Sequence, residues 1–223
     1  MRALVVANSM DADTGFVGER FRHHGYAFVE CHRERIAEWP DPTGIDLVLL
    51  LGSEWSVYWD EVAGPVAAEA ALVRSAHDRG VPLFGICFGS QMVSHALGGT
   101  VTRAARPEVG WHYVESDDPG NIAVGPWMQW HFDVFSVPPG FRELARSASG
   151  PQAIVHKRTF ATQFHPEVTE TIVSRWTAGD SGDLRRLGLD REHLMADTRE
   201  AMVTSGPACE RLVDWFVEAV AGA

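Results

Sequence analysis

Cysteine is scarce in this sequence of 223 residues, and its three cysteines lie far apart. Cys31, Cys87 and Cys209 have neither the spacing of a metal site nor the pattern of a disulfide framework. Such sparse cysteine usage is typical of proteins in a reducing compartment. We therefore expect a cytoplasmic protein that holds no metal.

Positive charge is also in short supply, because 19 Lys and Arg residues face 30 Asp and Glu residues and the formal net charge is -11. A surface that binds the phosphate backbone of a nucleic acid needs an excess of basic residues. Long apolar runs are missing as well, since none approaches the roughly 20 residues that span a bilayer. The apolar run at residues 3–7 is too short for an export signal. These absences argue against nucleic acid and membrane partners.

The hydrophobic content of 45% is ordinary for a globular protein, and the sequence has no internal repeat or low-complexity segment. A chain of this length can bury a substantial core in a single unit. We therefore expect one domain over residues 1–223. Helical patterns from Asp190 to Thr204 and from Pro207 to Ala219 predict a C-terminal helical extension at about 180–223.

Short apolar segments alternate with helical patterns in the first half of the chain. Continuous apolar strands of this kind are buried in a parallel sheet, with helices covering both faces. The predicted strands are residues 3–7, 27–31, 45–51 and 81–86, and the predicted helices are residues 16–24, 62–79 and 88–97. Residues 100–103 and 109–114 predict two short strands of a small antiparallel β region. The expected fold class is α/β, with an open, mostly parallel central sheet.

The strand at residues 81–86 leads directly into a helix, and Cys87 lies at the junction. A sharp strand-to-helix turn strains the corner residue and crowds its neighbours, and Gly85 and Gly89 relieve that crowding. The helix N-terminus also favours a thiolate over a thiol. The alternative interpretation is a buried structural cysteine. Ligand sites in parallel sheets lie beyond the carboxyl ends of the strands, where Cys87 and Gly52 both fall.

A second group of polar residues follows a later predicted strand, in the segment Gln163-Phe164-His165-Pro166-Glu167. Together with Gly85-Ile86-Cys87-Phe88-Gly89-Ser90-Gln91, this segment resembles the two signature motifs of the class I glutamine amidotransferases of the triad type. The resemblance covers nearly the whole chain and is to free-standing, GMP-synthase-like glutaminase domains. It implies the flavodoxin-like fold of that family.

The resemblance implies that Cys87, His165 and Glu167 form a catalytic triad. A carboxamide is a poor electrophile with a poor leaving group, so its hydrolysis needs a soft nucleophile, here Cys87. His165 would hold the proton and return it to the departing nitrogen, while Glu167 fixes the tautomer of the imidazole. Water would then hydrolyse the resulting γ-glutamyl thioester to glutamate. We expect L-glutamine or another γ-glutamyl amide as the substrate, and no cofactor.

The family binds the oxyanion with a Gly-Gly-Pro-x-Ser loop and with the amide of the residue after the nucleophile. The resemblance places these donors at the backbone amides of Gly52 or Ser53 and of Phe88. Ser53 and Glu54 replace the second glycine and the proline of the loop. Backbone amides do not depend on the side chain, so the oxyanion hole persists unless the backbone path requires a positive φ. An ordinary strand-end turn is the alternative interpretation of Gly52.

The resemblance also implies a substrate pocket that contains Gln91, Trp130, His131 and Phe132. Gln91 lies one helical turn after the nucleophile and faces the same opening. Stand-alone family members carry Trp-His-Gly-Asp where this chain has Trp-His-Phe-Asp at residues 130–133, so Phe132 replaces a glycine. The alternative interpretation of this segment is an edge strand.

Competing functions share parts of this pattern. An α/β-hydrolase with a cysteine nucleophile would place an acid before its histidine, so the order of His165 and Glu167 argues against it. A γ-glutamyl peptidase or hydrolase on the same scaffold, and a degenerate non-catalytic binding subunit, both stay open. The chain has no Gly-x-x-x-x-Gly-Lys-Ser/Thr motif, so a separate synthetase would have to use the ammonia. The oligomeric state, a homodimer included, also stays open.

Overall fold

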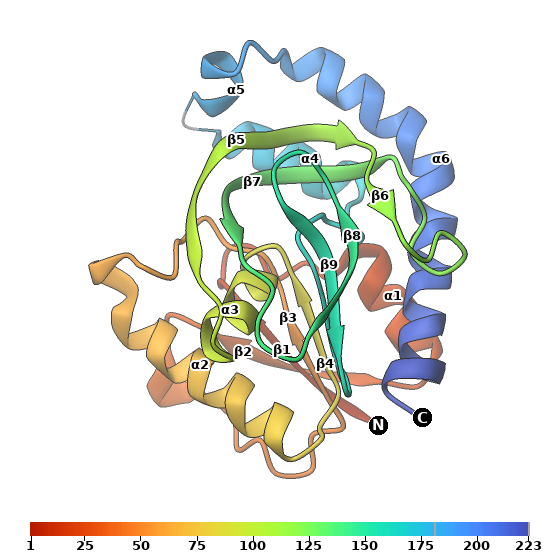
Figure 1. Ribbon diagram of the computed structural model, residues 1–223. Helices are drawn as coiled ribbons and strands as arrows, with labels where there is room; N and C mark the ends of the chain where they lie inside the picture. Colours follow the sequence, from red (N-terminus) through yellow and green to blue (C-terminus); the bar gives the residue numbers. More distant parts are fainter. Residues whose placement is uncertain (181, 223) are drawn as a thin grey trace.

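The computed structural model describes residues 1–180 and 182–222, and most of its strands belong to one mixed sheet (Figure 1). These strands are β1 (Arg2–Ala7), β2 (Ala27–His32), β3 (Leu47–Leu50), β4 (Leu83–Ile86), β6 (Glu115–Ser116), β8 (Arg142–Arg146), β9 (Pro151–His156) and β10 (Thr159–Thr162). Within the described residues the sheet has eight strands in the order β2-β1-β3-β4-β10-β9-β8-β6. Five neighbouring strands in this order, β2, β1, β3, β4 and β10, pair parallel to one another. The remaining strands β9, β8 and β6 extend the sheet through antiparallel pairs.

Helices cover both faces of this sheet, as the apolar strands predict. They are α1 (Gly15–His23), α2 (Ala63–Asp78), α3 (Phe88–Ala96), α4 (Glu170–Gly179), α5 (Asp183–Arg186) and α6 (Arg191–Trp215), with the short helical segments η1 (Ile36–Glu38), η2 (Asp60–Val62) and η3 (Phe216–Val220). In Figure 1, α2 and α3 lie on one side of the sheet, and α1 and α6 lie on the other. The predicted α/β fold class is confirmed.

The side chains of β1 show how the sheet is buried on both faces. Ala3 and Val5 belong to a core cluster with residues of α1, α6 and η3, whereas Leu4 and Val6 belong to a second cluster with residues of α2 and α3. Successive side chains of a strand point to opposite faces, so a strand between two helical layers is apolar at every position. The layered core fixes the carboxyl ends of β1, β3, β4 and β10 side by side.

The antiparallel region differs from the sequence expectation in one respect. The two short strands expected at residues 100–103 and 109–114 form a single strand, β5 (Val101–His112), which pairs with β7 (Trp127–Phe135) in a separate two-stranded sheet. The register shifts between Arg103 and Glu108, around Pro107. Proline has no N–H for the ladder and is tolerated at such irregularities. The strand therefore continues past the proline.

The C-terminal region differs in a similar way. The two helices expected on either side of Pro207 form one helix of 25 residues, α6, with the proline inside it. An interior proline costs about 3 kcal/mol in an isolated helix. Here Cys209, Leu212 and Val213 of α6 are fully buried in the main core, and this packing offsets the lost hydrogen bond. None of the helices in the described residues is long and apolar enough to cross a membrane.

Candidate active site

Cys87 occupies a strained backbone conformation between β4 and α3, with φ 52° and ψ -107°. L-residues rarely adopt this region because the Cβ atom crowds the backbone, and a residue held there costs about 1–3 kcal/mol. The Cys87 amide donates a hydrogen bond to the Thr162 carbonyl at the end of β10, with an N–O distance of 2.8 Å. The sharp turn that the sequence predicts is therefore present, and it places Cys87 where β4 and β10 both end.

The flanking glycines allow backbone segments to approach closely. A Cβ atom on Gly85 would lie 2.8 Å from the Gly89 carbonyl oxygen, and a Cβ atom on Gly89 would lie 2.4 Å from the Leu50 carbonyl oxygen. Both contacts are shorter than packing allows, and both involve backbone atoms that cannot move aside. The two glycines therefore allow α3 to pack closely against β3 and β4.

His165 follows β10 and is anchored on two sides. Its amide donates to the Met128 carbonyl in β7 at 2.8 Å, and its Nδ1 atom lies 2.7 Å from Oε1 of Glu167. Both side chains are about 4% exposed. Burial by itself lowers the pKa of the His165 imidazole, but the Glu167 charge and the Cys87 side chain raise the pKa well above its usual value. Glu167 thus stabilises the charged imidazolium.

This ion pair predicts a pH-dependent effect of Glu167→Gln on stability. Because the folded-state pKa of His165 lies above the unfolded value of about 6.5, the pair stabilises the fold below about pH 6.5. That stabilisation is lost as the pH rises through the folded-state pKa. We expect the variant to lose most free energy of unfolding at about pH 5.5 and least at about pH 9.5 in urea titrations.

The matched control for this experiment is Glu170→Gln, a neighbouring acid that is about half exposed and pairs with Arg199. An exposed pair contributes about 0–1 kcal/mol, so we expect little change at any pH. A Glu167→Gln variant whose loss of stability is the same at both pH values, or grows with pH, would contradict the assignment.

Gly52 lies close to both Cys87 and His165. A Cβ atom at Gly52 would be 3.1 Å from Cε1 of His165 and 3.7 Å from Cβ of Cys87. The two catalytic candidates therefore meet across the end of β3, although they are far apart in the sequence. In the described residues only Cys87 and Lys157 combine a side chain with a positive φ, so Ser53 and Glu54 follow the loop without strain of this kind.

Two predicted site residues use their side chains in contacts within the protein. The Gln91 amide nitrogen lies 3.4 Å from the Asp133 carbonyl oxygen and 3.4 Å from Oε1 of Gln163. His131 is buried, with Nδ1 3.0 Å from the Asp133 carbonyl oxygen and Nε2 3.2 Å from Glu108. Gln91 and His131 thus share one backbone acceptor and brace the end of β7 against α3.

The other two, Trp130 and Phe132, lie in β7 on either side of His131, so the segment is a strand, as in the alternative interpretation. The Trp130 carbonyl oxygen is 3.8 Å from the Cys87 sulfur, so the main chain of β7 borders the candidate nucleophile. The ring of Phe132 lies under the Arg103 guanidinium at 4.8 Å, and a guanidinium nitrogen is 3.9 Å from the Asp133 carboxylate. The Phe132 ring and the Arg103 charge therefore lie side by side on this strand pair.

The structure adds two residues that the sequence did not single out. Trp176 of α4 packs edge-on against the His165 ring at 4.8 Å between centroids, and its indole N–H donates to Asp11 at 2.9 Å. Asp133 accepts hydrogen bonds from the hydroxyls of Ser56 and Tyr58, which follow β3. A sequence signal existed for Asp133, which ends the Trp-His-Phe-Asp segment. Trp176 had none beyond its place in the helix after Glu167.

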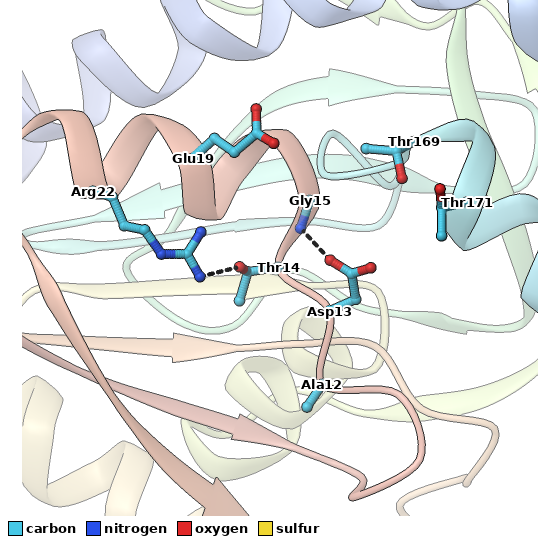
Figure 2. Close-up of a pocket in the computed structure, with 8 residues that line it drawn as sticks. All are labelled: Ala12, Asp13, Thr14, Gly15, Glu19, Arg22, Thr169 and Thr171. Atoms are coloured by element: carbon cyan, nitrogen blue, oxygen red, sulfur yellow. Dashed lines mark hydrogen bonds between the residues drawn. The ribbon is translucent and has the colours of Figure 1, made fainter.

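A hollow of about 360 Å³ lies where α1 and α4 begin (Figure 2). The backbone of Glu167 borders this region, because its carbonyl oxygen accepts a hydrogen bond from the Phe16 amide at 3.0 Å. The predicted site side chains are not among the residues that line it, which are Ala12, Asp13, Thr14, Gly15, Glu19, Arg22, Thr169 and Thr171. The hollow is thus separate from the Cys87 thiol.

Comparisons with known proteins agree with this geometry. The segment from residue 21 to residue 175 matches the family described as glutamine amidotransferase class-I. A GMP synthase [glutamine-hydrolyzing] of a Parafrankia species is 35% identical over 158 residues, which are 64% of this chain and 28% of that protein. The corresponding protein of Thermomicrobium roseum is 40% identical over 131 residues, which are 56% of this chain and 24% of that protein. The chain therefore matches only about a quarter of the length of these relatives.

Solved structures are similar over almost the full chain. A glutamine amidotransferase of Thermotoga maritima has a TM-score of 0.85 and 27% identity, covering 98% of this chain and 99% of that one. A glutamine amidotransferase of Methylobacillus flagellatus has a TM-score of 0.83 and 20% identity, covering 98% and 94%, and it supports the fold alone. The family match includes both signature segments, and the fold is shared. The chain belongs to the class I glutamine amidotransferase family.

Proposed function

We propose that this chain hydrolyses the side-chain amide of L-glutamine through a thioester on Cys87. The observation that carries the proposal is the arrangement of three side chains. Cys87 occupies a strained turn, and Nδ1 of the nearby His165 lies 2.7 Å from the buried Glu167 carboxylate. A nucleophile, a base and an orienting acid in this order are the minimum for acyl transfer by a thiol. The family of the chain makes glutamine the first substrate to test.

In the proposed reaction the Cys87 thiolate attacks the amide carbon, and the carbonyl oxygen becomes an oxyanion. The backbone amides of Ser53, or Gly52, and of Phe88 donate hydrogen bonds to it, and the loss of one such donor costs about 10²–10³ in rate. His165, held by Glu167, protonates the nitrogen as the C–N bond breaks and ammonia leaves. His165 then takes a proton from water, which attacks the thioester and releases glutamate.

Substrate positioning is proposed to involve the main chain of Trp130 and the side chains of Gln91 and Phe132. The Trp130 carbonyl, 3.8 Å from the sulfur, is within reach of a bound amide. The His131 ring is proposed to support this strand from behind, because both of its nitrogens face protein acceptors. The substrate would then contact the strand and not the His131 imidazole.

Ammonia is proposed to pass to an acceptor activated by a separate synthetase. The relatives named as GMP synthases are several times longer than the segment they share with this chain. The part they do not share is where an acceptor-activating function would lie in them. The three cysteines of this chain are free and buried, which fits the reducing, cytoplasmic setting expected from the sequence.

Phe132 favours one second candidate, a γ-glutamyl peptidase or hydrolase. By the resemblance, Phe132 stands where stand-alone family members carry glycine, and the Arg103 guanidinium is stacked on its ring, 3.9 Å from the Asp133 carboxylate. A positive group at this place would suit a substrate with an additional carboxylate, such as a γ-glutamyl peptide. The same replacement would also fit the degenerate binding subunit, which would turn over neither substrate.

Release of ammonia and glutamate from L-glutamine, beside cleavage of a panel of γ-glutamyl peptides, tests these functions directly. A glutamine-analogue diazoketone should label Cys87 alone, because burial raises the pKa of Cys31 to about 12 and raises that of Cys209 well above its usual range. Faster cleavage of the peptides would favour the peptidase. Equal labelling of all three cysteines, with no turnover of either substrate, would contradict both catalytic candidates.

A further inference from the structure

Arg33 is completely buried directly after β2, and every N–H of its guanidinium has an acceptor. The Nε and Nη2 atoms donate to the Glu69 carboxylate of α2 at 2.9 and 3.2 Å. The Nη1 atom donates to Oδ1 of Asn8 at 2.8 Å and to the Gly52 carbonyl at 3.0 Å. The Nη2 atom also donates to the Leu51 carbonyl at 3.0 Å. One side chain thus ties together the carboxyl ends of β1, β2 and β3.

The hydrogen bond to Gly52 fixes the orientation of one peptide group. The Gly52 carbonyl and the Ser53 N–H belong to the same planar trans peptide, so they point in opposite directions. With the carbonyl held toward Arg33, the Ser53 N–H points away from the guanidinium. Gly52 itself borders His165 and Cys87, so the face of this loop opposite Arg33 adjoins the candidate site.

The same guanidinium also contacts the residue that carries the second proposed oxyanion donor. Its carbon lies 4.9 Å from the centre of the Phe88 ring. Phe88 directly follows Cys87 and is the first residue of α3, and its side chain is 1% exposed. A cation over an aromatic face is an attractive contact that favours one placement of the ring. Arg33 therefore touches the segments of both proposed donors.

Stability alone is a weak explanation for this pair. Arg33 and Glu69 are 0% and 1% exposed, and moving two charges out of water costs as much free energy as their attraction returns. Buried ion pairs replaced by apolar side chains of similar size are often neutral or stabilising. The pair instead supplies fixed donors in a place where a strand ends and backbone carbonyls would otherwise lack partners.

We propose that Arg33, oriented by Glu69, is a positioning residue that aligns the Ser53 and Phe88 amides for the oxyanion. Arg33 does not touch the substrate in this proposal and acts through the Gly52 peptide and the Phe88 ring. The inference rests on the proposed hydrolysis of an amide by Cys87, and it names the part of the protein that pre-organises the oxyanion hole.

The double variant Arg33→Met with Glu69→Met tests the proposal, because it removes both buried charges and keeps apolar volume. We expect lower stability in urea, because the Leu51 and Gly52 carbonyls lose their donor, and in the folded variant a decrease of about 100-fold in kcat with a KM within about threefold of wild type. Glutamate γ-semialdehyde forms a hemithioacetal with a cysteine, and its affinity should fall by a similar factor. The rate of Cys87 alkylation by iodoacetamide, which forms no oxyanion, should not change.

The matched control removes another arginine–carboxylate pair, with Arg20→Met and Asp214→Asn, whose atoms lie 2.6 Å apart between α1 and α6. This variant should keep wild-type kcat. An unchanged kcat in the Arg33→Met/Glu69→Met variant would overturn the proposal. A kcat loss matched by an equal loss of alkylation would overturn it too, because the defect would then lie in the nucleophile.

Hydrogen exchange separates this inference from the proposed function. If the wild-type chain does not hydrolyse γ-glutamyl amides, the proposed function fails whatever the variant does. The amides of residues 52–55 should still exchange at least about tenfold faster in the Arg33→Met/Glu69→Met variant, since their peptide loses its anchor. Unchanged exchange in this segment would overturn the positioning role independently of activity.

Discussion

Replacement of Cys87 by alanine is expected to lower the kcat for glutamine hydrolysis by at least about 10⁴-fold while the fold is retained. The loss follows from the proposed covalent step, because water cannot use the same base and oxyanion donors as efficiently as a thiolate. Replacement by glycine should be equally inactive. Ammonia release at saturating glutamine measures both variants, and substantial residual activity in either one would contradict the proposed nucleophile.

The same two variants are expected to differ in stability. Alanine keeps the Cβ atom that strains the backbone at φ 52°, whereas glycine adopts this conformation freely. Relief of about 1–3 kcal/mol of strain exceeds the cost of about 0.5–1 kcal/mol for the greater freedom of glycine in the unfolded chain. Urea unfolding should therefore show Cys87→Gly to be about 1 kcal/mol more stable than Cys87→Ala. Equal stabilities would mean that the turn relaxes once the thiol is gone.

Gly89→Ala is expected to have the largest effect on folding. The added Cβ atom would lie 2.4 Å from the Leu50 carbonyl oxygen and 2.8 Å from the Leu50 Cβ atom, both on the adjacent strand β3. Relief of the clash requires α3 to move away from the sheet, and overpacking of this kind costs about 1–3 kcal/mol or more. Activity should fall as well, since α3 carries the Phe88 amide and its N-terminus faces Cys87.

Gly64→Ala is the matched control for this substitution. Gly64 lies in α2, and nothing is within 4 Å of the position that its Cβ atom would take. Alanine is favoured over glycine in a helix by about 0.5–1 kcal/mol, so this variant should be slightly more stable than wild type. A Gly89→Ala protein with wild-type stability and activity would show that α3 does not need the close contact with β3.

Local patterns in the sequence were sufficient for the elements near the site. Continuous apolar strands predicted the parallel sheet, and the Gly-x-Cys-x-Gly spacing predicted a tight turn at Cys87. These features depend on residues that are neighbours in the chain, and a strand that is buried on both faces must be apolar along its length. The predicted elements were wrong near two prolines, where a break was expected in the strand before Val109 and in the helix before Pro207. A register shift lets β5 continue past Pro107, and core packing stabilises α6 with Pro207 inside it.

Contacts between distant segments were outside the reach of any sequence pattern. Nothing near Arg33 indicates that it would meet Glu69 and Gly52, and the Trp176 contact with His165 has no signal of its own. Such contacts arise because parallel strands bring their carboxyl ends to one edge, whatever the length of chain between them. The sequence by itself determined the fold class, the family and the nucleophile candidate, since short motifs and apolar strands depend on residues that are neighbours in the chain. The tertiary structure alone decided which buried charges surround them, because a charge taken out of water must find its partner wherever the fold places one.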